Sequence, residues 1–382
     1  MTPQPPVLFD TLPTASGHAF GRATLNVPAS LNALSLAMVD LLDAQLKAWA
    51  ADARIAGVVL DAAGDKAFCA GGDVVAIAQE IHRLHQSQPG AVPQAASDFF
   101  EHEYRLDHRI HTYPKPLLVW GHGIVMGGGI GLMCGASHRV VTPKTRLAMP
   151  EITIGLYPDV AGSWFLPRLP GRAGAFLALT GAPVNAADAL YAGMADFALP
   201  FEQHGALLQA IGRARWQGEA EADGARLAHL IESLAHSSDA GGVPLPASPL
   251  QTHRARIDAA IGHDQLCDIA PRLAALAGDA DPWLAQAGAT FAKGSPTSAA
   301  LGLEMQRRCR HASLAEALRL EYQASVGCCA HGDFAEGVRA LLIDKDKTPR
   351  WTPARLDDVT PGWIEAHLKP RFDGAHPLAD LT

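Results

Sequence analysis

The sequence predicts an α/β fold followed by a helical C-terminal region. In the first half of the chain, short β-rich runs bounded by turn residues alternate with helical patterns, which is typical of a layered α/β core. Beyond about residue 200 the strand pattern ends, and amphipathic helical segments take over. With 382 residues, 48% of them hydrophobic and 18% charged, the chain can bury a sizeable core. We therefore expect a core over residues 1–200 and a helical region over residues 201–382.

Three runs in the first half have the composition of buried strands. They are IAGVVLDA from residue 55, PLLVWGHG from residue 116 and HRVVTP from residue 138. Each is apolar, and each ends at turn residues. Between residues 34 and 52 the apolar residues instead recur every three or four positions, which predicts a helix.

The second half has the helical spacing in several places, of which residues 202–217, 314–328 and 333–344 are the clearest. Two stretches rich in Pro, Gly and Ser, residues 85–97 and 237–249, are expected to be surface loops. The C-terminal half is therefore predicted to be helical, with loops between its helices.

The charge balance excludes several classes of partner. The formal net charge is −8 and no cluster of Lys and Arg occurs, so the chain lacks the electrostatic signature of a nucleic-acid or anionic-membrane binder. The longest apolar run, residues 117–135, contains seven glycines and a histidine, which argues against a membrane helix. We expect a small-molecule ligand, no nucleic acid and no membrane, and a homo-oligomer is compatible with the composition.

The cysteines and the N-terminal residues favour a cytoplasmic location. The six cysteines form no C-x-x-C pair, and a disulfide framework is uncommon in a chain of this length. The first residues have neither a basic start nor an apolar segment of the kind that directs export. Cys69 is expected to be a small buried thiol rather than a nucleophile, because no paired base is evident.

A glycine cluster, GGGIG at residues 127–131, stands where a buried strand turns into a helix. Gly121 and Gly123 could begin the dinucleotide-binding pattern G-x-G-x-x-G, but the third glycine position is Met126. The Walker pattern fails because no G-K-[ST] follows the cluster. What remains is a strand-to-helix turn whose free N–H groups can face developing negative charge, as in an oxyanion hole. KAFCAGGD, residues 66–73, offers a second such turn. Two tight turns that only permit close packing are the alternative.

These motifs resemble the enoyl-CoA hydratase/isomerase (crotonase) superfamily and, within it, the branch of 3-hydroxyisobutyryl-CoA hydrolases. The resemblance runs from about Leu31 to Gly193. Besides the two glycine motifs, this range contains AMPEITIGLYPDVAGSWFLPRLPG from residue 148 and FLALTG from residue 176, which also match. It implies a crotonase-like spiral of ββα turns followed by helices, and an acyl thioester of coenzyme A as substrate. It also implies oxyanion donors at the N–H groups of Gly72 and Gly128, with Ala70 near the CoA adenine. No metal and no cofactor are implied, because coenzyme A is part of the substrate.

The acidic residues distinguish the branches of that superfamily. The first of the two glutamates that a hydratase uses corresponds here to Gly131, whereas the second corresponds to Glu151. Asp159 stands where hydratases usually carry glycine, and Glu103 matches a substrate-contacting acid of the hydrolase branch. The resemblance therefore implies hydrolysis of 3-hydroxyisobutyryl-CoA, in valine breakdown.

The roles of these acids follow from the needs of thioester hydrolysis. Glu151 attacks the carbonyl and forms a mixed anhydride, or it activates water as a general base, and the sequence leaves both routes open. Asp159 would orient Glu151, the water or the substrate hydroxyl, and Glu103 would help to hold the acyl group. Without the resemblance, Glu151 reads as a surface or capping residue, and Asp159 as a turn or N-cap residue.

Two other functions are weighed against hydrolysis. One is hydration or isomerisation of an enoyl-CoA, which the absence of a carboxylate at Gly131 opposes. The other is a catalytically silent acyl-CoA-binding protein, which the presence of Glu103, Glu151 and Asp159 opposes.

Overall fold

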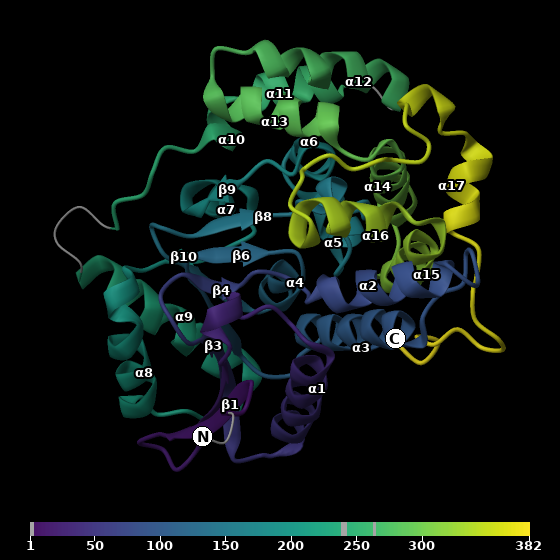
Figure 1. The fold of residues 1–382 in the computed structure, drawn as a ribbon. Helices are drawn as coiled ribbons and strands as arrows, with labels where there is room; N and C mark the ends of the chain where they lie inside the picture. The colour runs from purple at the N-terminus through teal and green to yellow at the C-terminus, as the bar shows by residue number, and fades with distance from the viewer. Residues whose placement is uncertain (1–3, 238–242, 263–264) are drawn as a thin grey trace. The chain divides into compact units, whose positions relative to one another are not determined.

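The structure is a computed structural model that describes residues 4–237, 243–262 and 265–382 (Figure 1). The chain forms two compact units, and each is assembled from three segments. The first unit contains Met1–Gly72, Leu106–Leu147 and Val184–Ser248. The second contains Asp73–Arg105, Ala148–Pro183 and Pro249–Thr382.

The first unit is built on a six-stranded sheet with the order β1-β2-β3-β5-β7-β10. Its strands are β1 (Val7–Pro13), β2 (Ala19–Leu25), β3 (Ile55–Ala62), β5 (Leu117–Gly121), β7 (His138–Val141) and β10 (Phe197–Ala198). β1 and β2 form an antiparallel hairpin, and the remaining neighbours pair in parallel. The central strand β3 is buried along almost its whole length, as expected of a parallel strand that is covered on both faces.

A second, four-stranded sheet has the order β4-β6-β8-β9. Its strands are β4 (Ala67–Cys69), β6 (Ile124–Met126), β8 (Arg146–Ala148) and β9 (Val184–Asn185). Along the chain, a strand of the large sheet is followed by a strand of the small sheet and then by a helix: β3, β4, α2 (Val74–His85), and again β5, β6, α4 (Gly128–Cys134). This repeat is the predicted succession of ββα turns.

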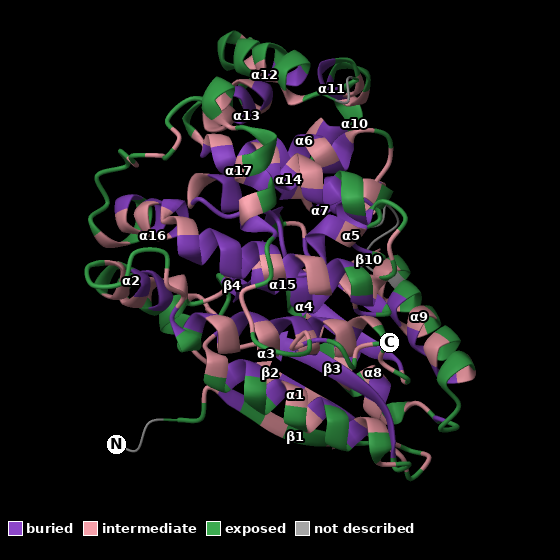
Figure 2. Cartoon of the chain, turned by 90° about the vertical axis from the view of Figure 1, so that its right-hand side faces the viewer, coloured by how far each residue is buried: buried purple, intermediate pink, exposed green. Residues whose placement is uncertain are grey.

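The other helices of the first unit are α1 (Leu36–Ala51), α7 (Ala186–Ala192), α8 (His204–Arg213) and α9 (Ala220–Ser237), with short 3₁₀ turns at η1 (Pro28–Ser30) and η4 (Phe201–Gln203). α1 begins where Ser35 accepts a hydrogen bond from the backbone N–H of Met38, which is an N-cap. Its buried residues, such as Leu42, Leu46 and Trp49, recur at helical spacing. Figure 2 shows the opposite, exposed face of α1 in green.

The second unit is helical. Its helices are α5 (Gly162–Phe165), α6 (Ala173–Thr180), α10 (Pro249–Thr252), α11 (Arg254–Ile261), α12 (Leu266–Ala275), α13 (Pro282–Lys293), α14 (Pro296–Cys309), α15 (Leu314–His331), α16 (Asp333–Val338) and α17 (Pro361–His367), besides α2. The shorter elements are the 3₁₀ turns η2 (Glu151–Thr153), η3 (Leu166–Arg168), η5 (Leu276–Gly278) and η7 (Leu356–Asp358), and the π-helix η6 (Arg339–Ile343). α11, α12 and α13 pack side by side (Figure 1). α3 (Gln94–His111) starts in this unit and ends in the first.

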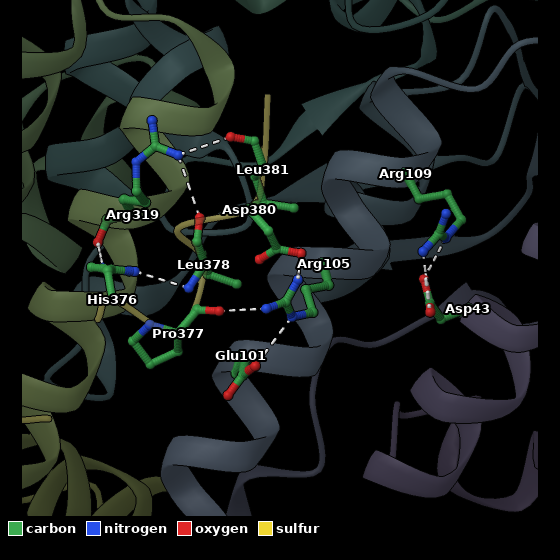
Figure 3. A network of polar contacts seen from close by, with 10 residues as sticks. All are labelled: Asp43, Glu101, Arg105, Arg109, Arg319, His376, Pro377, Leu378, Asp380 and Leu381. Carbon is green, nitrogen blue, oxygen red and sulfur yellow. Dashed lines mark hydrogen bonds and ion pairs between the residues drawn. The ribbon is translucent and has the colours of Figure 1, made fainter. Parts of the chain in front are cut away.

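Polar contacts bind the last residues of the chain to α3 and α15. Arg105 on α3 contacts Glu101, the carbonyl of Pro377 and, at 2.9 Å, the carboxylate of Asp380 (Figure 3). Arg319 on α15 donates to the carbonyls of Leu378 and Leu381 at 3.3 and 3.0 Å. The C-terminal residues therefore brace both helices.

The structure confirms most of the predicted elements. β3, β5 and β7 lie where the three apolar runs predict strands. The predicted helical stretches 202–217 and 333–344 contain α8 and α16, and α15 covers residues 314–328 and continues to His331. The loop predicted at residues 85–97 ends earlier, because α3 already begins at Gln94. The predicted loop 237–249 includes residues 238–242, which lie outside the described residues.

Beyond residue 200, the described part of the chain contains helices and loops but no strand. None of its helices combines the length and the apolar character needed to cross a membrane. The expected division of the chain at residue 200 stays a prediction.

Candidate active site

Two glycine turns follow neighbouring parallel strands of the small sheet. β4 pairs in parallel with β6, so the turn after Cys69 and the turn after Met126 lie at the same edge of that sheet. Gly71 has φ +102° and Gly127 has φ +47°, which L side chains rarely adopt. A Cβ atom added to Gly129 would lie 2.5 Å from the carbonyl oxygen of Cys69. The glycines therefore let the two turns approach each other closely.

The two explanations for the glycine cluster, close packing of two turns and an oxyanion hole, are compatible, because they involve different glycines. Gly129 serves close packing, whereas Gly128 opens α4, and the first N–H groups of a helix have no acceptor within the helix. Gly72 ends the neighbouring turn, so the two proposed oxyanion donors belong to adjacent turns of one unit. Ala70 lies in the same turn as Gly72, and its own N–H is bonded to the carbonyl of Leu31 at 3.1 Å.

Glu151 lies in the second unit, at the start of η2 and directly after the Met149–Pro150 segment that follows β8. Its side chain is buried, with 4% of the residue exposed, so the surface interpretation is wrong. The N-cap position of η2 is Pro150 and no side chain among the described residues caps this turn, so the structure does not support the capping interpretation either. Within the described part of the chain, Oε2 of Glu151 is buried without a hydrogen-bond partner. Burial and, second, the negative charge of Asp159 raise the pKa of Glu151 well above its ordinary value.

Asp159 lies in the turn that leads into α5, and its side chain does not cap that helix. The N-cap position is Ala161, and no side-chain capping bond is made there by residues of the turn itself. Instead, Oδ2 of Asp159 accepts a hydrogen bond from the hydroxyl of Tyr104 at 2.6 Å. Burial raises the pKa of Asp159 to about 6, although the hydrogen bond from Tyr104 acts in the opposite direction. The structure therefore does not support the N-cap interpretation of Asp159.

Tyr104 belongs to a buried hydroxyl network that the sequence did not reveal. Its hydroxyl lies 2.6 Å from Oγ of Ser325 on α15, which in turn lies 3.0 Å from the hydroxyl of Tyr157. A hydroxyl carries a single proton, and Tyr104 donates its proton to Asp159, so Ser325 donates to Tyr104. Glu103 is buried and precedes Tyr104 on α3, the helix whose Tyr104 hydroxyl contacts Asp159.

Another buried acid near Asp159, Glu321 on α15, was also missed by the sequence analysis. Its two carboxylate oxygens accept hydrogen bonds from the N–H groups of Ala161 and Ser163, both at 2.8 Å. Burial raises the pKa of Glu321 to about 8, with a further contribution from the charge of Asp159. The available signal is that Glu321 lies on the same side of the helix as Leu318 and Ser325, which is the buried side of α15.

In the second unit, Glu151 and Asp159 lie close enough for the charge of Asp159 to raise the pKa of Glu151. Gly72, Gly128 and Ala70 belong to the first unit, whereas Glu103, Glu151 and Asp159 belong to the second. A buried carboxyl group whose pKa is raised is a strong base and nucleophile once it loses its proton, and a neighbouring carboxylate with a different pKa allows the pair to hold one proton near neutral pH. This pair can serve acyl transfer to Glu151 or proton transfer from water.

Comparison with known protein families identifies the chain. The family model described as Enoyl-CoA hydratase/isomerase matches residues 20–368. The chain belongs to this family. Among curated proteins it is 38% identical to the mitochondrial 3-hydroxyisobutyryl-CoA hydrolase of Gallus gallus, over 94% of this chain and 89% of the relative. It is 35% identical to the Homo sapiens protein of the same name, over 91% of this chain and 86% of the relative.

Solved structures of the family have the same fold. The structure of a carnitinyl-CoA dehydratase from Mycobacterium thermoresistibile matches with a TM-score of 0.81 and 35% identity, over 96% of this chain and 97% of that one. The structure of an enoyl-CoA hydratase from Rhodobacter sphaeroides 2.4.1 matches with a TM-score of 0.77 and 36% identity, over 96% and 98%. The predicted fold class, α/β with a helical C-terminal region, is confirmed.

Proposed function

We propose that this chain hydrolyses the thioester of 3-hydroxyisobutyryl-CoA to 3-hydroxyisobutyrate and free coenzyme A, a reaction of valine catabolism. The similarity to curated hydrolases of that name over most of both chains supports the substrate. The observation that carries the chemistry is Glu151, a buried carboxyl group next to the charge of Asp159, one oxygen of which has no hydrogen-bond partner among the described residues.

Two balanced routes use the same residues. In one, the Glu151 carboxylate attacks the thioester carbonyl, coenzyme A leaves as a thiolate that takes up a proton, and water opens the resulting mixed anhydride. In the other, Glu151 takes a proton from water, which attacks the carbonyl directly. In both routes the N–H groups of Gly72 and Gly128 are proposed to stabilise the oxyanion. Glu103 is proposed to hold the acyl group, and Ala70 to contact the adenine of the coenzyme.

A trapping experiment distinguishes the two routes. Hydroxylamine added during turnover converts a mixed anhydride on Glu151 into a hydroxamate, which changes the mass of the peptide that contains this residue. A general-base route leaves that mass unchanged while thiol release continues.

Hydration of an enoyl-CoA is the second candidate, because two similar solved structures are named as a hydratase and a dehydratase. Position 131, in the buried turn of α4, is glycine and offers no carboxylate for this reaction. Thiol release from 3-hydroxyisobutyryl-CoA and loss of enoyl absorbance from crotonyl-CoA, measured in separate cuvettes, test the two activities directly. Binding of both esters without either signal would support a catalytically silent acyl-CoA-binding protein.

The remaining expectations are proposals of the same kind. We propose that the reaction needs no cofactor, which turnover after dialysis against a chelator tests. A homo-oligomer is tested by light scattering. The cytoplasmic location is proposed from the cysteine usage alone, whereas the curated relatives are named as mitochondrial, so cell fractionation is the deciding measurement.

A further inference from the structure

The turn that carries Asp159 has an unfavourable backbone conformation. Val160 has φ +51° and Ala161 has φ +69°, so two consecutive L residues occupy the left-handed region, and one of them is β-branched. The N–H of Gly162 closes the turn on the carbonyl of Asp159 at 2.6 Å. Such a conformation persists only where surrounding contacts determine it.

Helix α15 provides two contacts of this kind. The carboxylate of Glu321 accepts the N–H groups of Ala161 and Ser163 with one oxygen each, both at 2.8 Å. Hydrogen bonds from N–H groups to a carboxylate are stronger than those between neutral groups, so these two bonds favour the charged form of Glu321 against the burial that raises its pKa to about 8. The charged clamp is therefore fully formed above pH 8, where its effect on kcat is measured. One helical turn later, Ser325 holds Tyr104, whose hydroxyl reaches the Asp159 side chain.

We propose that Glu321 is a positioning residue for hydrolysis: its carboxylate clamps the left-handed turn at Val160 and Ala161 and thereby sets the place of the Asp159 carboxylate. Two residues of α15 act on this turn in different ways. Glu321 holds the backbone of the turn, whereas Ser325 acts on the side chain of Asp159 through Tyr104. This inference rests on the proposed function, because Asp159 is assigned its role there.

The test is the variant Glu321→Gln. Glutamine has nearly the shape of glutamate, but one of its two oxygens becomes an NH₂ group that faces a backbone N–H and cannot accept it. We expect kcat for 3-hydroxyisobutyryl-CoA to fall at least about tenfold while KM changes less than about threefold, as for a lost interaction that matters in the transition state. An unchanged kcat overturns the proposal.

A double-mutant cycle separates positioning from general structural damage. If Glu321 acts through Asp159, then Glu321→Gln has little further effect on kcat in an Asp159→Asn background, because the group to be positioned has lost its charge. Equal factors in both backgrounds overturn the proposal.

Rescue gives a second, independent measurement. Glycine adopts a left-handed conformation without steric cost, so Ala161→Gly should restore part of the kcat that Glu321→Gln removes. A double variant with no higher kcat than Glu321→Gln alone overturns the clamp as the cause.

The matched control is Asp333→Asn. Asp333 is also a buried acid of the second unit, and it accepts one backbone N–H, from Thr352 at 2.8 Å, and one hydroxyl, from Ser295 at 2.8 Å. We expect kcat of this variant to stay within about twofold of the wild type, as for a site without shared partners. A loss equal to that of Glu321→Gln would make both residues merely structural.

Hydrogen exchange keeps the test separate from the proposed function. Loss of the clamp should speed amide exchange in the peptide that contains residues 159–163, whether or not the protein hydrolyses this ester. Wild-type protein that releases no thiol contradicts the proposed function, whereas unchanged exchange in Glu321→Gln contradicts the clamp.

Discussion

The hydroxyl of Tyr104 lies 2.6 Å from Oδ2 of Asp159 and 2.6 Å from Oγ of Ser325, so one buried phenol joins an acid to a helix far away in the sequence. Because all three groups are buried, the hydrogen bonds are made in a low-dielectric environment and restrict where the acid can lie. The hydrogen bond from Tyr104 stabilises the charged form of Asp159, whereas burial favours the neutral form.

This relationship predicts the effect of Tyr104→Phe. Loss of the hydrogen bond removes an influence that lowers the pKa of Asp159, so that pKa should rise above about 6. If hydrolysis needs the charged form, the rising limb of kcat against pH moves to higher pH. Tyr113→Phe is the control, because Tyr113 also has a hydrogen-bonded hydroxyl, partly buried, which donates to the carbonyl of Leu46. An unmoved limb in Tyr104→Phe would show that Asp159 does not control the profile.

Glu151→Gln should nearly abolish hydrolysis while the ester still binds. The amide keeps the size of the side chain but can neither attack the carbonyl nor take a proton from water. The measurements are thiol release and, separately, binding of the CoA ester by calorimetry. Binding that disappears together with turnover would make Glu151 a structural or ground-state contact.

The fold could largely be predicted from the sequence, because its signals are local. The apolar run IAGVVLDA matches β3 from Ile55 to Ala62, and the helical spacing that starts near Ser35 matches α1. The loop predicted before α3 was too long, since Gln94 and its neighbours are helical despite their Pro- and Ser-rich setting. Such boundaries depend on tertiary contacts that local composition does not carry.

The site could be predicted only where a motif with recognisable spacing exists. Glu151 and Asp159 stand in one short segment that resembles a known family, and the structure buries both. Glu321 and Ser325 belong to a helix about 160 residues further along the chain, so nothing local connects them to Asp159. Their contribution depends on how α15 packs, which the sequence pattern describes only as an amphipathic helix.

The glycine turns predict a contrast between two neighbouring substitutions. Gly128→Val should leave the fold largely intact; valine keeps the backbone N–H, but its branched side chain would stand against the thioester, so turnover should fall about a hundredfold or more, as for the loss of one oxyanion donor of roughly 3 kcal/mol. Gly129→Ala should instead lower the melting temperature, because its Cβ would lie 2.5 Å from the carbonyl oxygen of Cys69. Turnover and thermal melting of both variants test this contrast. Normal turnover in well-folded Gly128→Val would contradict the oxyanion role.

Asp159→Asn should lower activity and raise stability at alkaline pH. The folded state raises the pKa of Asp159 from 3.8 to about 6, so the folded protein binds this proton more tightly than the unfolded chain does. The resulting stabilisation is complete below pH 3.8 and is lost as the pH rises through about 6, because the buried group must then carry its charge. Each pKa unit corresponds to about 1.4 kcal/mol, so the neutral amide should stabilise the protein by at most a few kcal/mol at pH 8.

The charge of Asp159 also raises the pKa of Glu151, so in Asp159→Asn any remaining hydrolysis should begin at lower pH than in the wild type. The measurements are kcat against pH and melting temperatures near pH 4.5 and pH 8.

The control Asp333→Asn separates the effect on stability from the effect on activity, because burial also raises the pKa of Asp333 to about 6. This control should gain stability at pH 8 but keep its kcat, since Asp333 contacts Ser295 and Thr352 rather than the hydroxyl network of Asp159. A full kcat and an unmoved pH profile in Asp159→Asn would remove the residue from the mechanism, and with it the feature that most clearly separates hydrolysis from hydration in this family.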